Sequence, residues 1–235
     1  MSLSYRALAL LLTYPTEATR ALLPAAAAVL EDDARIPAPI RRSLVKLAED
    51  IGAADLYETQ ERYVWLFDRT RSLSLNLYEH VHGESRDRGQ AMVALLELYR
   101  SKGLELSANE LPDHLPVFLE FLSTLPDDEA ASLLGEGAHV LHAIGERLHK
   151  RQSPYRAVFG ALTALAVDAA DAEALASLMA EPDDNPDDLE AMDKLWAETA
   201  VSFGPSDVGC PKAEALVTAM NANPRPARPR AGATA

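Results

Sequence analysis

The sequence predicts an all-α protein, a single-domain bundle of roughly nine to ten helices followed by a disordered C-terminal tail. Three observations support this fold class. Apolar residues recur at helical spacing along most of the chain, start and stop signals flank the periodic segments, and strand-like alternation with β-branched residues is almost absent. Of the 235 residues, 48% are hydrophobic, which is enough to bury a sizeable core.

The N-terminal part contains four predicted helices, at residues 3–13, 16–32, 38–51 and 54–68. The first includes an apolar stretch, Leu8 to Leu12, that superficially resembles a signal peptide. It has one early positive charge and no small-residue cleavage site, and Tyr14-Pro15 is typical of a helix end, so we expect a helix of the mature protein. In the fourth, Tyr63 and Phe67 share one helix face, which favours core packing over partner contact.

Six further helices are predicted at residues 85–102, 114–124, 127–150, 154–169, 172–180 and 187–199. Gly103, just beyond a last turn with basic residues, is a stop signal for the first of them. Pro126 followed by three acidic residues marks the start of the helix at 127. Two stripes with the spacing i, i+3, i+4, i+7 predict core-facing helix surfaces: Met92, Leu95, Leu96 and Tyr99, and Leu115, Phe118, Leu119 and Leu122.

Three segments are predicted to lie outside the helices. Residues 69–84 form the longest predicted connection within the helical region, and long ordered loops tend to carry function. The acidic stretch Glu181 to Asp188 is expected to be a solvated linker. We predict a helical domain at residues 1–200 and an irregular, largely disordered tail at 201–235, because NANPRPARPRAGATA, from Asn221 on, has no apolar face to offset its ordering entropy.

The charge balance narrows the possible partners. Acidic residues number 36 and basic residues 22, giving a formal charge of −14 that repels nucleic acids and anionic membrane surfaces. A basic peptide is a better match, although acidity can also serve solubility alone. No stretch approaches the roughly 20 apolar residues that span a bilayer, so direct membrane insertion is not expected. The single cysteine, Cys210, cannot form an internal disulfide, and we expect a cytoplasmic protein.

An enzyme would need a nucleophile with a base, a metal cage or a phosphate cradle. Gly135 to Gly137 begins like a dinucleotide fingerprint but lacks the third glycine and follows no strand. Two histidine pairs have spacings that would allow metal ligation: His80 with His82, and His139 with His142. A histidine pair on a helix is more often a surface feature, so we predict no catalytic residue, no metal site and no permanently bound cofactor.

The most specific pattern lies between Tyr63 and Pro116, where the sequence includes YVWLFDRTRSLSLNLYEHVHGESRDRGQAM and ELPDHLP. It resembles the assembly chaperones (delta subunit type) of membrane-bound respiratory nitrate reductase, within the cytoplasmic chaperones that mature molybdenum enzymes. Two family elements are matched, an aromatic-x-x-Leu-Phe element and a Glu-Pro-x-Asp-His element: Tyr63, Leu66 and Phe67, and Glu110, Asp113 and His114. In this sequence the proline, Pro112, directly precedes Asp113 instead of following the glutamate. Weaker resemblance extends over most of residues 5–210.

The resemblance implies a system-specific chaperone that binds the immature catalytic (alpha) subunit of nitrate reductase, especially its N-terminal peptide. It would hold that subunit competent for molybdenum cofactor insertion, prevent premature membrane attachment, and stay out of the final enzyme. A permanent structural subunit of a redox complex and a nucleotide hydrolase are the alternatives. Ten residues are candidates for partner binding: Tyr63, Phe67, Tyr78, Glu79, His80, Arg86, Asp87, Glu110, Asp113 and His114.

Asp113 and His114 also have a predicted local role. We expect Asp113 to be the N-cap of the helix at 114–124, with Pro112 restricting the chain before it. His114, in the first turn, would lie near the positive end of the helix dipole, which favours a neutral ring. Beside a groove, both side chains could contact a peptide. The expected mechanism is helix-in-groove recognition, with apolar anchors in a hydrophobic channel and basic residues against an acidic rim.

Overall fold

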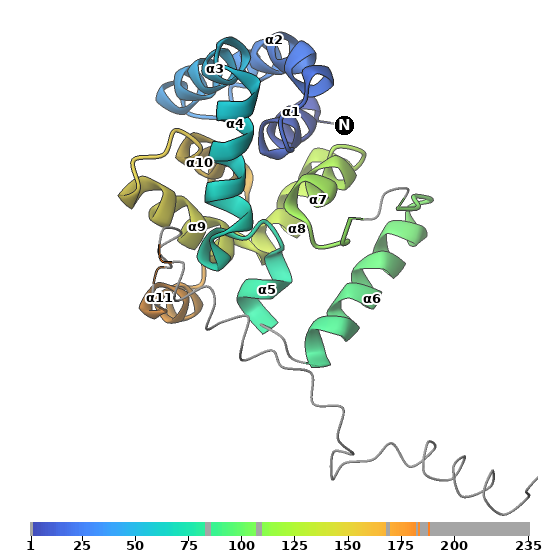
Figure 1. The fold of residues 1–235 in the computed structure, drawn as a ribbon. Coiled ribbons are helices and arrows are strands. Elements are labelled where there is room, and N and C mark those ends of the chain that lie inside the picture. Colours follow the sequence, from blue (N-terminus) through green and yellow to red (C-terminus); the bar gives the residue numbers. More distant parts are fainter. Residues whose placement is uncertain are drawn as a thin grey trace, which may run out of the picture. The chain divides into compact units, whose positions relative to one another are not determined.

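The computed structural model describes residues 2–82, 86–106, 110–167 and 170–181, together with Asp183 and Asp188. Within these ranges the regular structure is helical, with eleven α-helices and two short turns of π- and 3₁₀-helix (Figure 1). The all-α prediction is therefore confirmed. The predicted helix at 187–199, the domain limit at residue 200 and the tail at 201–235 lie outside the described residues.

The first three helices match their predicted ranges closely. They are α1 (Leu3–Leu12), α2 (Glu17–Asp32) and α3 (Ala38–Ala53). Helix α2 begins with a capping box, in which Thr16 and Thr19 each accept a hydrogen bond from the other's backbone N–H. Most residues of helix α1 are buried, and the helix packs against α2, α7 and α10. The apolar stretch at Leu8 to Leu12 is thus part of the core.

The predicted helix at 54–68 is present but changes character along its length. Asp55 caps α4 (Leu56–Tyr63), and the chain continues as the π-helical turn η1 (Val64–Asp68). The prediction of a non-helical connection at 69–84 was wrong, because this stretch contains the 3₁₀ turn η2 (Arg71–Leu73) and the short helix α5 (Leu77–His82). Helix α5 spans only six residues, too few for an apolar pattern repeated over several turns to indicate a helix.

Helix α6 (Arg86–Ser101) is followed by Gly103, whose φ of 77° confirms the predicted stop signal. Helix α7 spans Leu115–Leu122. The single helix predicted at 127–150 was wrong in one respect, because it divides into α8 (Asp127–Glu136) and α9 (Ala138–Lys150). At Gly137 the backbone has a ψ of 7°, and its N–H bonds to Leu134 O instead of continuing the helix.

The last two described helices are α10 (Arg156–Leu165) and α11 (Ala172–Ala180), and residues 1–188 form one compact unit. Helix α9 packs against both α10 and α11. Arg147 of α9 is 2% exposed and joins two distant segments, because its guanidinium donates to Ser72 O at 3.0 Å and to Leu178 O at 2.6 Å. Within the described residues, none of the helices is both long and apolar enough to cross a bilayer.

Candidate partner-binding site

A predominantly apolar cavity of about 330 Å³ lies between α5, α6, α7 and the corner where α8 meets α9. Helices α5 and α6 contact each other, and both contribute lining residues. The lining includes two of the predicted partner-binding residues, Tyr78 and Asp113. The remaining lining residues are Leu77, Val81, Ala94, Leu95, Leu98, Phe118, Leu133, Glu136, Gly137, His139 and Val140.

Asp113 caps α5 rather than the helix that follows it in sequence. Its Oδ2 accepts a hydrogen bond from Tyr78 N at 3.1 Å, and its backbone oxygen accepts one from Leu77 N at 3.1 Å. The predicted N-cap role for α7 was wrong, because the cap position is His114, which makes no side-chain cap bond. Helix α7 has little need of one, since Pro116 has no N–H and Leu115 N bonds to Leu75 O.

The Asp113 carboxylate is completely buried. Burial raises its pKa above the ordinary value of 3.8, while the bond from Tyr78 N and the Arg88 guanidinium act in the opposite direction. Its second oxygen, Oδ1, has no hydrogen-bond partner among the described residues. The wall of an apolar cavity therefore contains a carboxylate of which only one oxygen is hydrogen-bonded.

The two sequence elements at 63–68 and 110–114 come together in space. Burial lowers the pKa of His114, whereas the negative charges of Glu110, Asp113 and Asp68 raise it. Glu110 Oε2 lies 3.8 Å from His114 Nδ1. Burial also raises the pKa of Asp68, and His114 lowers it. The predicted neutral state of His114 has the right direction, but burial is its main cause rather than the helix dipole.

Residues 33–161 match the model of the nitrate reductase delta subunit family, a range that includes every residue lining the cavity. The chain belongs to this family. It is 46% identical over 163 residues to the nitrate reductase molybdenum cofactor assembly chaperone NarJ of Escherichia coli (strain K12), covering 68% of this chain and 67% of NarJ. Over 198 residues it is 38% identical to the probable nitrate reductase molybdenum cofactor assembly chaperone NarW of the same strain, covering 84% and 82%.

A third relative is more distant. The probable nitrate reductase molybdenum cofactor assembly chaperone NarJ of Bacillus subtilis (strain 168) is 29% identical over 162 residues, covering 69% of this chain and 87% of the relative. The resemblance drawn from the residues between Tyr63 and Pro116 is thus confirmed at the level of the family.

In this delta subunit family member, the first pair of predicted residues belongs to the core. Tyr63 and Phe67 are each 5% exposed, and their ring centroids lie 5.1 Å apart. Tyr63 Oη donates to Leu12 O at 2.9 Å, and Phe67 packs edge-on against Tyr155. Their expected packing role is confirmed. Neither lines the cavity, and partner contact by them stays a prediction.

Glu79 and His80 fasten α5 to the chain before it. Glu79 Oε2 accepts from Ser74 Oγ at 2.6 Å, and His80 Nε2 lies 2.8 Å from Ser74 O, to which it donates when the proton is on Nε2. Asp87 is exposed on α6, and the side chain of Arg86 lies outside the described part of the structure. The contacts of Glu79 and His80 with Ser74 hold α5, one wall of the cavity, against the preceding segment.

Sequence reasoning missed most of the cavity's lining. Leu95 was predicted as part of a core-facing stripe but was not connected with partner binding. The signal that could have found the lining residues of α6 is the position of Leu95 and Leu98 one turn apart. That signal gives a helix face and not its partner, so the cavity itself was not predictable.

The buried histidines give this family member a predictable response to acid. Burial lowers the pKa values of His80 and His114 below 6.5. Because the folded state then binds fewer protons than the unfolded state, the stability due to the neutral rings is present above pH 6.5 and lost as pH falls. We expect wild type to lose more free energy of unfolding than the His80→Gln/His114→Gln variant between about pH 7 and about pH 5. Urea denaturation measures this, and parallel pH profiles would contradict it.

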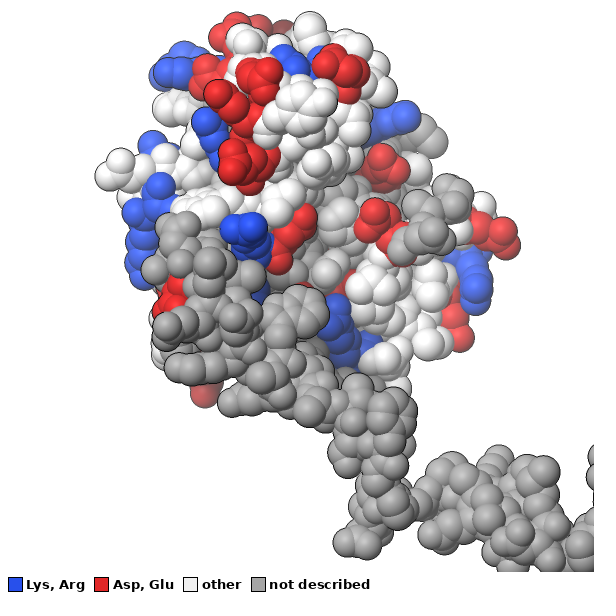
Figure 2. Space-filling view, viewed as in Figure 1, with Lys and Arg blue, Asp and Glu red and all other residues white. Residues whose placement is uncertain are grey.

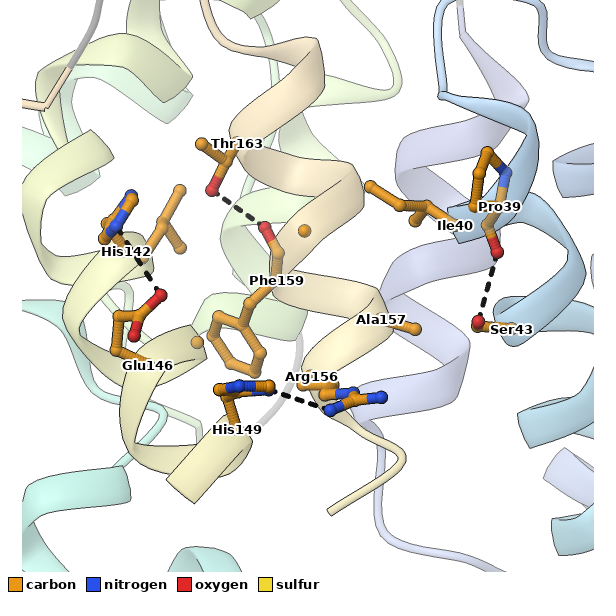
Figure 3. Close-up of a pocket in the computed structure, with 13 residues that line it drawn as sticks. Pro39, Ile40, Ser43, His142, Glu146, His149, Arg156, Ala157, Phe159 and Thr163 are labelled. Carbon is orange, nitrogen blue, oxygen red and sulfur yellow. Dashed lines mark hydrogen bonds and ion pairs between the residues drawn. The ribbon is translucent and has the colours of Figure 1, made fainter. Parts of the chain in front are cut away.

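A second cavity, of about 410 Å³, lies between α3, α9 and α10 (Figure 3). Four of its polar side chains form two pairs: His142 Nε2 lies 3.9 Å from Glu146 Oε1, and Arg156 Nη1 lies 2.8 Å from His149 Nδ1. None of the predicted partner-binding residues lines it. Among the described residues, no group of three or more His, Cys, Asp or Glu side chains is placed to hold a metal ion. The cavity beside α5 is therefore the better candidate site.

Proposed function

We propose that this protein is a system-specific chaperone that binds the immature catalytic (alpha) subunit of nitrate reductase through its N-terminal segment. The observation that supports this most is the apolar cavity beside α5, which lies in the family-matched region and is lined by Tyr78 and Asp113. The relatives' names, as nitrate reductase molybdenum cofactor assembly chaperones, point to the enzyme system.

The proposed mode of binding is an amphipathic client helix with its apolar side chains against the cavity walls. Leu77 and Val81 form one wall, and Leu95 and Leu98 form the other. Burying a large apolar side chain contributes roughly 1.5–3 kcal/mol. Three anchors thus contribute about 5–9 kcal/mol, close to the roughly 8 kcal/mol of a micromolar complex, before the cost of association is subtracted. Apolar burial alone is therefore too weak for a micromolar complex, and polar contacts must add to the affinity.

The surface charge supports a basic client segment. On the face shown in Figure 2, acidic side chains gather over α4. The whole chain has a formal charge of −14, which attracts cationic segments over distances of about a Debye length. This attraction raises the rate of encounter more than the final affinity.

In this proposal the chaperone performs no catalysis and keeps no cofactor of its own. While it holds the N-terminal segment, the client stays competent for molybdenum cofactor insertion and cannot attach prematurely to the membrane. It then leaves, and is not part of the final enzyme. We place these steps in the cytoplasm, in keeping with a sequence that has a single cysteine.

Calorimetric titration tests the proposal, with the full chain and a synthetic peptide from the N-terminus of the co-encoded catalytic subunit. We expect saturable binding with a negative heat-capacity change, the signature of apolar burial. The control peptide has the same charges, with its large apolar residues replaced by serine, and should not bind. No binding of the natural peptide at low salt would contradict the proposal. Co-purification with the mature reductase in fixed stoichiometry would favour a permanent structural subunit instead.

A further inference from the structure

The polar groups in the cavity beside α5 need an explanation beyond capping. One oxygen of Asp113 is enough to cap α5, and asparagine, serine or threonine would do this without a charge. Burying a carboxylate that has an unsatisfied oxygen costs several kcal/mol. The cavity wall thus contains a carboxyl group of which the fold uses only one oxygen.

Arg88 compensates this charge only in part. Its guanidinium is close enough to lower the pKa of Asp113, yet no ion pair within 4.0 Å joins the two among the described residues. Arg88 Nε is itself buried without a hydrogen-bond partner. Asp113 Oδ1 therefore keeps an unfilled acceptor position, on a residue that lines the cavity.

A second carboxylate acts on the same cavity. Glu136 lines it and is exposed to solvent. Burial raises the pKa of the Tyr78 hydroxyl, and the charges of Asp113 and Glu136 raise it further, so both carboxylates act on the space beside this ring. Asp113 is closed off from solvent and Glu136 is exposed, so one carboxyl group lies in the wall of the cavity and a second lies on its exposed side.

We propose that this cavity binds a long cationic side chain, a lysine or arginine of the client, whose methylene stem lies on the apolar walls and whose charged group reaches Asp113. This rests on the proposed function and names the residue class that the site takes. Lysine and arginine suit it because their stems cover apolar surface while the head seeks a polar partner. The pairing differs from contact with an acidic rim, because a buried pair is screened much less by salt than an exposed one.

Three small probes of equal chain length test the proposal on the full chain: n-hexylammonium, 1-hexanol and hexanoate. We expect hexylammonium to bind about tenfold or more tightly than hexanol, because its head makes a charge-assisted hydrogen bond to a carboxylate. Hexanoate should bind most weakly. The preference for ammonium should persist at high salt. Chemical shift titration by NMR gives the three affinities.

Three variants locate the preference. Asp113→Asn keeps an oxygen for Tyr78 N–H but removes the charge, so it should bind hexanol as before and lose the preference for ammonium. Glu136→Gln should remove only the part of the ammonium preference that weakens with added salt, because Glu136 is exposed to solvent. Ala94→Trp, which fills the cavity, should abolish binding of both probes, and this separates the cavity from other acidic surface.

Equal affinity of wild type for hexylammonium and hexanol would overturn the proposal, as would the absence of saturable hexylammonium binding or a preference that survives in Asp113→Asn. The wild-type comparison needs no variant to fold. If the preference is found and the client peptide does not bind, the proposed function fails and the cation site stands. If the peptide binds and wild type shows no preference, the cation site fails and the proposed function stands.

Discussion

Replacing Ala94 with tryptophan is expected to lower the affinity for the client peptide by about tenfold to a hundredfold and to leave the fold intact. Ala94 lies on α6, lines the cavity beside α5 and is exposed, so an indole there occupies the space of a client anchor without displacing the core. Losing one anchor of roughly 1.5–3 kcal/mol gives this range. Calorimetry with the peptide measures the effect, and circular dichroism verifies the helix content.

The matched control is Val93→Trp, one residue earlier on the same helix. Val93 is 56% exposed and does not line the cavity. Both variants add an aromatic residue to an exposed position of α6, where helix propensity changes by only a few tenths of a kcal/mol. Peptide affinity should stay near the wild-type value in Val93→Trp. Equal affinities in the two variants would show that the peptide binds elsewhere.

Replacing Arg147 with methionine is expected to lower the free energy of unfolding by about 2–4 kcal/mol. The change removes the hydrogen bonds to Ser72 O and Leu178 O and leaves two buried carbonyl groups without that donor. Each such loss costs about 1–3 kcal/mol, and the relief of burying one fewer charge offsets part of the sum. Urea denaturation of both proteins measures the difference.

Arg151→Met is the control for this substitution. Arg151 lies one helical turn later, pairs with Asp183 at 2.7 Å and stacks over the Trp65 ring at 5.8 Å, but these contacts are nearer the surface. We expect a loss of about 1 kcal/mol or less. If Arg147→Met proved as stable as wild type, the desolvation of the guanidinium would outweigh its two hydrogen bonds.

The elements that were predictable from sequence are those whose signals are local. The stripe at Leu115, Phe118, Leu119 and Leu122 predicted α7 because a buried helix face repeats within a single segment. Gly103 marked the end of α6 because a left-handed residue after a helix is most readily a glycine. In both, the information lies within a few residues of the element that it specifies.

The elements that escaped prediction depend on distant residues. Helix α5 has six residues, far fewer than an isolated helix needs in water, and its N-terminus is capped by a side chain 35 positions downstream. The break at Gly137 was also not predictable, because a glycine can lie within a continuous helix as well as at a break. The candidate site combines α5, α6, α7, α8 and α9, so the sequence could name Tyr78 and Asp113 as candidates but could not bring them together.

Because Asp113 caps a helix that lies 35 residues earlier in the chain, the cap can form only after both segments have been synthesised. Ribosomes add roughly 5–20 residues per second, so Tyr78 is made seconds before Asp113. Val140, the last residue of the cavity wall, follows later still, and α1 must wait for α7 and α10 before it can be buried. The residues that line the cavity are therefore not all present until well over half of the chain has been synthesised. If the proposed client is made at the same time, its first residues emerge before newly started copies of this protein have completed the cavity.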